Sequence, residues 1–453
     1  MTPPANRPVE PTDASDPADG GRGGWWIRRP PWWPPAELLV APALVVLLLH
    51  AVTPLAALFP HQGDLLLYFQ KAESFAAGGL PYRDFAFEYP PLALISMALP
   101  YLAWPGGTPD FDVYRWAFTL WQAVLLVGTA ILAARLADLV AAEYPELDRL
   151  PLVRTVGLRL VVLVIVTAPS LAFRFDLLPA LLVGLAVLAV LEDRPGWAGA
   201  LIALGGLVKV YPLVLVPLLA ALWLARRDRF GAISFLATMG FTIGIVLLPV
   251  SLFAGDAAWF FLSYQADRGL QLETVAAGFI LLGSALQGVI VPFEFEFGAV
   301  HVAGAAADAY LAVQPWLFVL GPLIIAAFGF VIARAELAVF GRLRGATVIG
   351  LAVAAVTMFI ITNKVISVQY VVWLIPLAAL LPRGQFWLTV AIGVLSIAIH
   401  PLFYDALLRE ELPIIVVLCL RNVLFIGLLG WVLADLALGL PQPAVAAEEP
   451  NPA

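Results

Sequence analysis

Long apolar segments separated by short polar islands fill the chain from residue 35 to residue 438. The apolar runs are about 16 to 25 residues long, and an α-helix needs roughly 20 residues to cross ~30 Å of hydrocarbon. We count about 11 to 13 such runs. The pattern therefore predicts an all-α, polytopic integral membrane protein.

The most polar island, residues 63–91, follows the first apolar run and reads GDLLLYFQKAESFAAGGLPYRDFAFEYPP. Apolar side chains recur at helical spacing from Asp64 to Ala77, and Gly78-Gly79 then ends the pattern. This spacing predicts an amphipathic helix lying in the plane of the membrane interface. A turn is expected at Pro81–Asp84. We place this first loop on the extracytoplasmic face.

Residues 1–34 are rich in Pro, Gly, Asp and Ala, which predicts a disordered cytoplasmic tail. The tail ends in WWIRRPPWW, an aromatic belt with a positive flank, and this favours a cytoplasmic N-terminus. A second disordered cytoplasmic tail is expected at 439–453, so that 35–438 forms one transmembrane domain. The protein is thus expected to be a multi-pass protein of a bacterial plasma membrane.

Charged residues flank the segment from Trp197 to Ala225 on both sides, and both flanks look cytoplasmic. Two short half-helices that meet at Lys209 would explain this and would place Lys209 outside. The alternative is one tilted span. Between 92 and 174, the sides of the membrane assigned to the polar segments alternate consistently only if the short apolar run 92–104 does not cross the membrane.

Composition narrows the class of protein further. The chain is 62% hydrophobic and 13% charged, and its net charge of −7 provides no basic field for nucleic acid. The single Cys419 excludes disulfides and cysteine metal sites. The four histidines lack metal-ligand spacing, so we assign no metal and no cofactor. Only three lysines accompany 22 arginines, a usage that hints at a GC-rich bacterium.

Two carboxylates of the first loop are candidate catalytic groups. Asp64 could act as a general base that takes a proton from an acceptor hydroxyl, or it could simply cap the helix that begins beside it. Glu88, next to Pro90-Pro91, is a second candidate base or a ligand of sugar hydroxyls. The structural alternatives for Glu88 are an ion pair with Arg83 or a solvated acid at the membrane interface.

Three cations are predicted on the same outer face: Lys209, Arg268 and Lys364. Fixed cations stabilise the charge that develops on a phosphate leaving group, although each could instead snorkel to lipid phosphate. Arg174 and Asp176 interrupt one apolar block, and we expect them to pair with each other. Several aromatic side chains could stack on sugars or serve only as interfacial anchors: Tyr68, Tyr82, Tyr89, Tyr211, Trp259 and Tyr370.

Taken together, these segments resemble the GT-C superfamily of glycosyltransferases that use polyprenyl-phosphate sugars, and within it glycosyltransferase family 87, which includes actinobacterial α-mannosyltransferases. The resemblance spans about residues 36–435. The matching segments are Gly63-Asp64, the GGLPYRDF and FEYPPL pieces of the first loop, 174–179 (RFDLLP), 209–212 (KVYP), 268–273 (RGLQLE) and 364–376 (KVISVQYVVWLIP).

The resemblance implies a GT-C-like fold with an extracytoplasmic active site. Asp64 would be the base of an inverting transfer that converts a β-linked polyprenyl-phosphate hexose, with mannose expected, into an α-linked product on a lipid or glycan acceptor. Donor phosphate contacts would fall to Lys209, Arg268 and Lys364. Further substrate-binding candidates in the matching segments are Tyr82, Arg83, Tyr89, Tyr211 and Gln369. Many GT-C enzymes carry paired acids in the first loop, whereas Asp64 here is single, which makes a metal-bridged phosphate less favourable.

A different function class stays open. A transporter or flippase of a lipid-linked or small substrate would also bury charges in an apolar bundle. The absence of repeated halves and the collection of polar residues at one face favour the enzyme. An arabinose donor remains an alternative to mannose. A ligase of pyrophosphate-linked glycans would need a larger basic loop, and a non-catalytic scaffold does not explain why the rare lysines fall in outward islands.

Overall fold

The computed structural model describes residues 33–52, 63–144 and 149–439, and these residues are almost entirely helical. Both tails predicted to be disordered lie largely outside them. Within the described residues, seven helices are long and apolar enough to cross a membrane. They are α5 (Phe111–Ala141), α6 (Arg149–Phe173), α10 (Arg229–Ala254) with its continuation to Ala266, α13 (Ala305–Phe340), α14 (Gly345–Thr362), α16 (Arg383–Ile397) with its continuation to Leu402, and α18 (Leu412–Leu438).

Shorter apolar helices fill the spaces between the long ones. They are α1 (Ala36–Val52), α4 (Ala93–Leu102), α7 (Leu177–Leu191), α8 (Pro195–Val208), η1 with α9 (Tyr211–Leu215 and Val216–Ala225), α12 (Val275–Gln287) and η3 with α15 (Val368–Leu374 and Ile375–Ala378). At 1.5 Å per residue, the ten residues of α4 span only about 15 Å. The run 92–104 is thus too short to cross a membrane.

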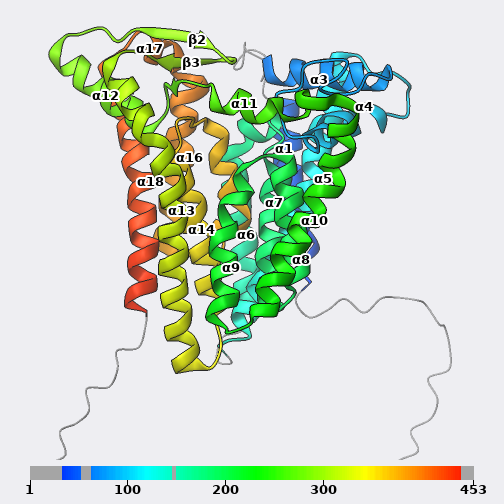
Figure 1. Cartoon of the computed structure of the whole chain (residues 1–453), viewed down its shortest axis with the longest axis vertical. Coiled ribbons are helices and arrows are strands. Elements are labelled where there is room, and N and C mark those ends of the chain that lie inside the picture. Colours follow the sequence, from blue (N-terminus) through cyan, green and yellow to red (C-terminus); the bar gives the residue numbers. More distant parts are fainter. Residues whose placement is uncertain (1–32, 53–62, 145–148, 440–453) are drawn as a thin grey trace, which may run out of the picture.

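The long helices stand side by side, and the two ends of the bundle differ (Figure 1). One end, here called the loop end, carries α3 (Gly63–Ala76), α4, α11 (Phe260–Ala266), α12, α17 (Tyr404–Leu408) and three short strands. The opposite end, here called the connector end, holds the short turns between α7 and α8, α9 and α10, and α13 and α14. The loop end corresponds to the face predicted to be extracytoplasmic.

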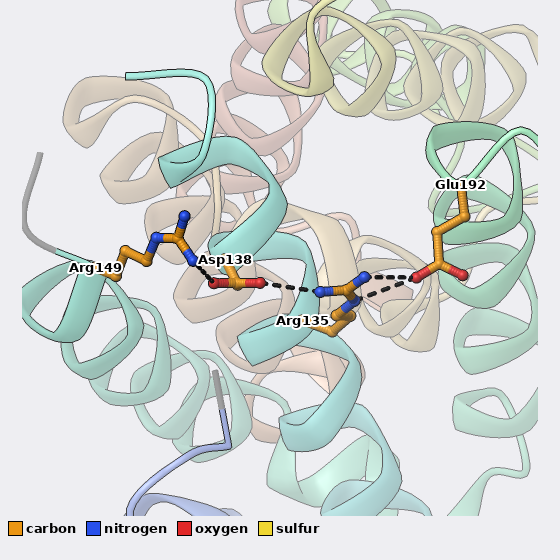
Figure 2. Close-up of polar contacts among 4 residues, drawn as sticks. All are labelled: Arg135, Asp138, Arg149 and Glu192. Atoms are coloured by element: carbon orange, nitrogen blue, oxygen red, sulfur yellow. Dashed lines mark hydrogen bonds and ion pairs between the residues drawn. The ribbon is translucent and has the colours of Figure 1, made fainter. Parts of the chain in front are cut away.

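Ion pairs tie the helices together at the connector end. The Arg135 guanidinium donates to Glu192 Oε1 at 3.0 and 3.2 Å and to Asp138 Oδ2 at 2.9 Å, while Arg149 reaches the other oxygen of Asp138 at 3.3 Å (Figure 2). These four residues link α5, α6 and the end of α7. Asp138 is buried, and a buried carboxylate is costly unless it is paired. The two arginine partners of Asp138 compensate its charge.

The segment from Trp197 to Ala225 is a hairpin of two short arms. Its ends lie together, since Arg226 Nη1 pairs with Asp193 Oδ1 at 3.1 Å. Gly206 allows the arms to approach near the tip, where a Cβ would lie 2.7 Å from a methyl of Leu213. The prediction of two half-helices meeting at Lys209 is confirmed, and the alternative of one tilted span is wrong.

Strands are an exception to the all-α prediction. β1 (Leu270–Gln271), β2 (Phe293–Glu296) and β3 (Ala299–Val302) form an antiparallel sheet in the order β1-β3-β2. Val302 pairs with both Leu270 and Phe293. The two residues between β2 and β3, Phe297 and Gly298, both have positive φ, as the turn of a tight hairpin requires. The all-α prediction did not include this sheet.

Large apolar side chains cover the outside of the bundle as well as its core. On α10, Phe241 is 69% exposed and Leu252 is 79% exposed, and similar side chains line α13. An apolar surface of this extent on a helical bundle is consistent with contact to lipid. Together with the seven long apolar helices, this surface is consistent with a membrane-embedded protein.

Candidate active site

The first loop folds back onto the loop end of the bundle. Leu65, Tyr68 and Ala72 form the buried face of α3, while Gln70 and Glu73 lie on its exposed face, so the predicted amphipathic helix is confirmed. The buried face packs in one cluster with Phe118 of α5, Phe175, and Leu207 at the end of α8. Gly78, with φ +92°, ends the helix as expected.

The loop is also joined to the Lys209 hairpin through the backbone. The N–H of Leu92, which follows Pro90-Pro91, donates to the carbonyl of Leu207 at 2.9 Å. This bond satisfies a carbonyl in the last turn of α8 that has no partner within the helix. The first loop and the tip of the hairpin, which are far apart in the sequence, therefore lie next to each other.

Asp64 lies in the first turn of α3 and forms an ion pair with Arg174, which follows α6. The Asp64 side chain is 38% exposed, so it remains open to the loop end. The predicted pair of Arg174 with Asp176 is wrong. Phe175 between them is buried, and the two charged side chains have different partners, because Arg174 reaches the first loop and Asp176 enters the bundle.

Asp176 is the most deeply buried carboxylate of this region, with 1% of its side chain exposed. Its Oδ1 accepts a hydrogen bond from Lys209 Nζ and one from Trp373 Nε1, both at 2.6 Å. Its Oδ2 has no hydrogen-bond partner in the described part of the chain. The sequence folds this way because α8 ends at Val208 and Lys209 takes an extended conformation, which directs its side chain toward the start of α7.

Aromatic rings surround the Lys209 ammonium. Nζ lies 5.3 Å from the ring centre of Phe175, 5.6 Å from that of Trp373 and 5.9 Å from that of Tyr370. Trp373 is itself stacked between Tyr370 at 3.7 Å and Tyr211 at 4.0 Å. Both tyrosine rings thus have one face covered, and their predicted role in stacking on a sugar stays untested.

Arg268 and Lys364 meet at the same end. Lys364 Nζ donates to the carbonyl of Ala266 at 2.6 Å, and the N–H of Gln271 donates to the carbonyl of Lys364 at 2.9 Å. Burial and the neighbouring charge of Arg268 lower the pKa of Lys364. The Nε atom of Arg268 is buried and has no hydrogen-bond partner among the described residues. Arg268 is therefore a cation with one N–H group that has no hydrogen-bond acceptor among the described residues.

Glu273 and Arg421 were not foreseen as part of this site. Arg421 is 1% exposed within the apolar helix α18, and its Nη2 donates to the Glu273 carbonyl at 2.8 Å and lies 3.9 Å from Glu273 Oε2. Burial raises the pKa of Glu273 to about 7, with Arg421 and Arg174 opposing the shift. The one signal in the sequence was a lone arginine within an apolar run, which is costly unless paired.

The remaining candidates of the first loop form a separate group. Glu88 pairs with Lys71 at 3.7 Å, and Arg83 pairs with Asp84 at 2.9 Å, so the proposed pair of Glu88 with Arg83 is wrong. The Tyr82 hydroxyl donates to the Tyr89 carbonyl. The Tyr89 ring packs edge-on against Phe175 at 5.2 Å and links this group to the Lys209 cluster.

A groove of about 720 Å³ lies beside the turn of the first loop. It is lined by Tyr82, Arg83, Asp84, Phe85, Ala86, Phe87, Asp256, Ala257, Trp259, Phe260 and Ser263. Its volume is in the range of small-molecule sites. Tyr82 and Arg83 thus line this groove, whereas Lys209, Arg268, Lys364 and Gln369 belong to the deeper cluster around Tyr370.

The chemistry of the deeper cluster is that of an anion site. Within the described residues, it combines Arg174, Lys209, Arg268, Lys364 and Arg421 with Asp64, Asp176, Asp267 and Glu273. Cations exceed carboxylates by one, and by two when Glu273 is protonated. In the same part of the chain, no group of three or more His, Cys, Asp or Glu side chains could hold a metal ion.

No family model matches this chain, and no curated protein matches it.

Proposed function

We propose that the chain is an integral membrane glycosyltransferase that transfers a hexose, with mannose as the expected sugar, from a polyprenyl-phosphate donor to a lipid or glycan acceptor at the loop end. The observation that carries the proposal is the position of the open carboxylate of Asp64. Through its ion pair with Arg174 it borders a cluster with an excess of cations.

The transfer needs a base and an anion-stabilising group close together. The acceptor hydroxyl oxygen forms a bond to the anomeric carbon and gives its proton to Asp64. The bond from that carbon to the phosphate oxygen breaks, and its electron pair leaves with the polyprenyl phosphate. Arg268 and Lys364 would stabilise this charge. Attack opposite to the leaving group inverts a β-linked donor to an α-linked product.

The two groups of polar residues would then bind different substrates. The buried cluster around Lys209 and Arg268 would take the donor phosphate and sugar. The groove beside Tyr82 and Trp259 would take the acceptor, because it is open at the loop end and offers both aromatic and charged side chains. Asp64 belongs to the same first loop, of which residues 82–87 line the groove.

A transporter or flippase is the second candidate, and one observation favours it. Helical chain is interrupted at Lys209 and again at Asn363–Ser367, and both interruptions lie beside buried charges. Broken helices around a central polar site are common in transporters. Translocation of a fluorescent polyprenyl-phosphate sugar across proteoliposomes, without transfer of the sugar, would support this candidate.

The test of the enzyme is transfer of radiolabel from polyprenyl-phosphate-mannose to endogenous lipid in membranes that contain the protein. We expect Asp64→Asn to slow transfer by about 10²- to 10⁴-fold, as the loss of a general base does. Glu73→Gln is the matched control, because Glu73 lies on the exposed face of the same helix. Glu88→Gln tests the second carboxylate of the loop.

The outcomes separate the alternatives. Label in a new glycolipid that is lost with Asp64→Asn at equal protein level would establish both the activity and the base. Full activity of Asp64→Asn would move the base to Glu88 or elsewhere. No transfer by the wild type from mannose or any other polyprenyl-linked sugar would make the transporter the first candidate.

A further inference from the structure

Arg268 stands in a short irregular connection between a helix and a strand. The helix α11 ends at Ala266 and the strand β1 begins at Leu270, so residues 267–269 lie outside both elements. The strand that follows is only two residues long. A segment with so few regular hydrogen bonds keeps its place only if other elements contact it. The position of the Arg268 guanidinium therefore depends on the neighbours of this connection.

The β2–β3 hairpin is the neighbour best suited to hold it, because its base is fixed in the bundle. Val291 precedes the hairpin and Val302 ends it, and both are buried in one apolar cluster with side chains of α12, α17 and α18. The N–H of Val291 also lies 3.2 Å from each oxygen of the Glu410 carboxylate. The hairpin thus extends from an anchored base.

Two backbone carbonyls of the hairpin accept hydrogen bonds from either side of Arg268. On the α11 side, the Tyr264 hydroxyl donates to the Phe297 carbonyl at 3.0 Å, and the two rings pack edge-on at 5.1 Å. On the β1 side, the N–H of Leu272 donates to the Val300 carbonyl at 3.0 Å. The chain is therefore held before and after the arginine by the same hairpin.

His301 forms the third contact, directly beside the arginine. It is 3% exposed on β3, the central strand of the sheet. Its Nε2 lies 3.1 Å from the Glu296 carbonyl oxygen, and because a carbonyl only accepts, Nε2 carries the hydrogen. The other side of the ring faces Gly269, where an added Cβ would lie 3.3 Å from Nδ1. The ring thus sets the distance between the hairpin and the backbone next to Arg268.

We propose that the β2–β3 hairpin is a clasp for the connection that carries Arg268, and that His301 and Tyr264 are positioning residues that act through this arginine. The inference rests on the proposed function, in which Arg268 stabilises the phosphate leaving group. A displacement of about 1 Å at a reacting group can cost on the order of 100-fold in rate. A loosened clasp therefore lowers the rate of transfer although the arginine itself is still present.

The first test is a set of double variants in the transfer assay with polyprenyl-phosphate-mannose. We expect His301→Ala and Tyr264→Phe each to lower kcat/KM by about tenfold. In an Arg268→Gln background, the same changes should cost less than about twofold, because the side chain to be positioned is gone. General damage to the fold would instead multiply with the loss caused by Arg268→Gln. His301→Gln, whose amide can still donate to the Glu296 carbonyl, should recover most of the activity.

The second test measures hydrogen exchange of the purified protein in detergent and does not depend on any activity. The N–H groups of Gln271 and Leu272 are bonded to the carbonyls of Lys364 and Val300, so the segment 266–272 should exchange slowly in the wild type. His301→Ala and Tyr264→Phe should each speed this exchange about tenfold or more.

Tyr114→Phe is the matched control for the loss of a tyrosine hydroxyl. Its hydroxyl also donates to a backbone carbonyl at 3.0 Å, that of Met97, but on α5 and α4. It should leave the exchange of 266–272 unchanged.

The outcomes of the two tests are separate. The clasp is refuted if neither His301→Ala nor Tyr264→Phe changes the exchange of 266–272. The positioning role is refuted if their losses of kcat/KM multiply with that of Arg268→Gln. If the wild type transfers no sugar but both variants exchange faster at 266–272, the proposed function fails and the clasp stands.

Discussion

The ion pair of Lys209 with Asp176 allows the sharpest test of the structure. Replacing Lys209 with Met removes the cation and leaves a carboxylate that is 1% exposed. Of its two hydrogen-bond donors, only the indole N–H of Trp373 would then remain. Loss of one partner of a buried ion pair typically costs about 3–5 kcal/mol. We expect Lys209→Met to lower the free energy of unfolding by that amount.

The second variant separates lost charge compensation from lost packing. In the double variant Lys209→Met with Asp176→Asn, the asparagine oxygen still accepts from Trp373 and no charge is left unpaired. We expect the double variant to regain all but about 1–2 kcal/mol, the scale of an ordinary hydrogen bond. Arg149→Met is the control, because its contact with Asp138 involves a half-exposed arginine and should cost under about 1 kcal/mol.

The assay is unfolding of the purified protein by sodium dodecyl sulfate in mixed micelles, followed by circular dichroism at helical wavelengths. The reasoning is refuted if Lys209→Met costs no more than the Arg149 control. It is also refuted if the double variant is as unstable as the sum of the two single variants, since the charges would then act independently.

Three further predictions concern stability and pH. Trp373→Phe should cost about 1.5–3 kcal/mol in the same assay, because it removes a hydrogen bond to a buried carboxylate. The pKa of Glu273 is raised from 4.5 to about 7, so the folded state holds a proton that the unfolded state releases. Stability should therefore fall as pH rises from 4.5 to 7 and level off above, and Glu273→Gln should flatten this slope; an unchanged slope would contradict the assignment. Gly199→Ala should destabilise α8 against α10, because its Cβ would lie 2.1 Å from the Phe235 carbonyl oxygen, whereas Gly240→Ala, with open space around it, should be neutral or stabilising in thermal melts.

Features encoded locally were predictable from the sequence. The hairpin at Lys209 followed from charged residues on both of its flanks, and in the structure an ion pair of Arg226 with Asp193 joins these flanks. The amphipathic helix of the first loop followed from apolar spacing and its terminal glycines. Each depends on the period of a helix or on the cost of burying charge, and both can be read from a single stretch of chain.

Features that depend on contacts across the chain were not predictable. Arg174 and Asp176 are two residues apart and yet face different neighbours, because the linker between α6 and α7 turns at that point. Glu273 and Arg421 are separated by almost 150 residues, and nothing local joins them. The strands β2 and β3 are only four residues long, and an alternation of apolar and polar residues over so few positions is a weak signal of a strand.

The three predicted cations are not equivalent, and their partners indicate how their roles divide. Lys209 is already held by a carboxylate and aromatic rings, so it fixes Asp176 and Trp373 in place and adds positive potential to the site. Lys364 contacts a backbone carbonyl, which a phosphate oxygen could replace at little electrostatic cost. Arg268 alone among the three has a buried donor without a partner in the described part of the chain. If an anionic leaving group binds at this end, Arg268 is the first group to receive it, Lys364 the second, and Lys209 sets the shape of the site around them.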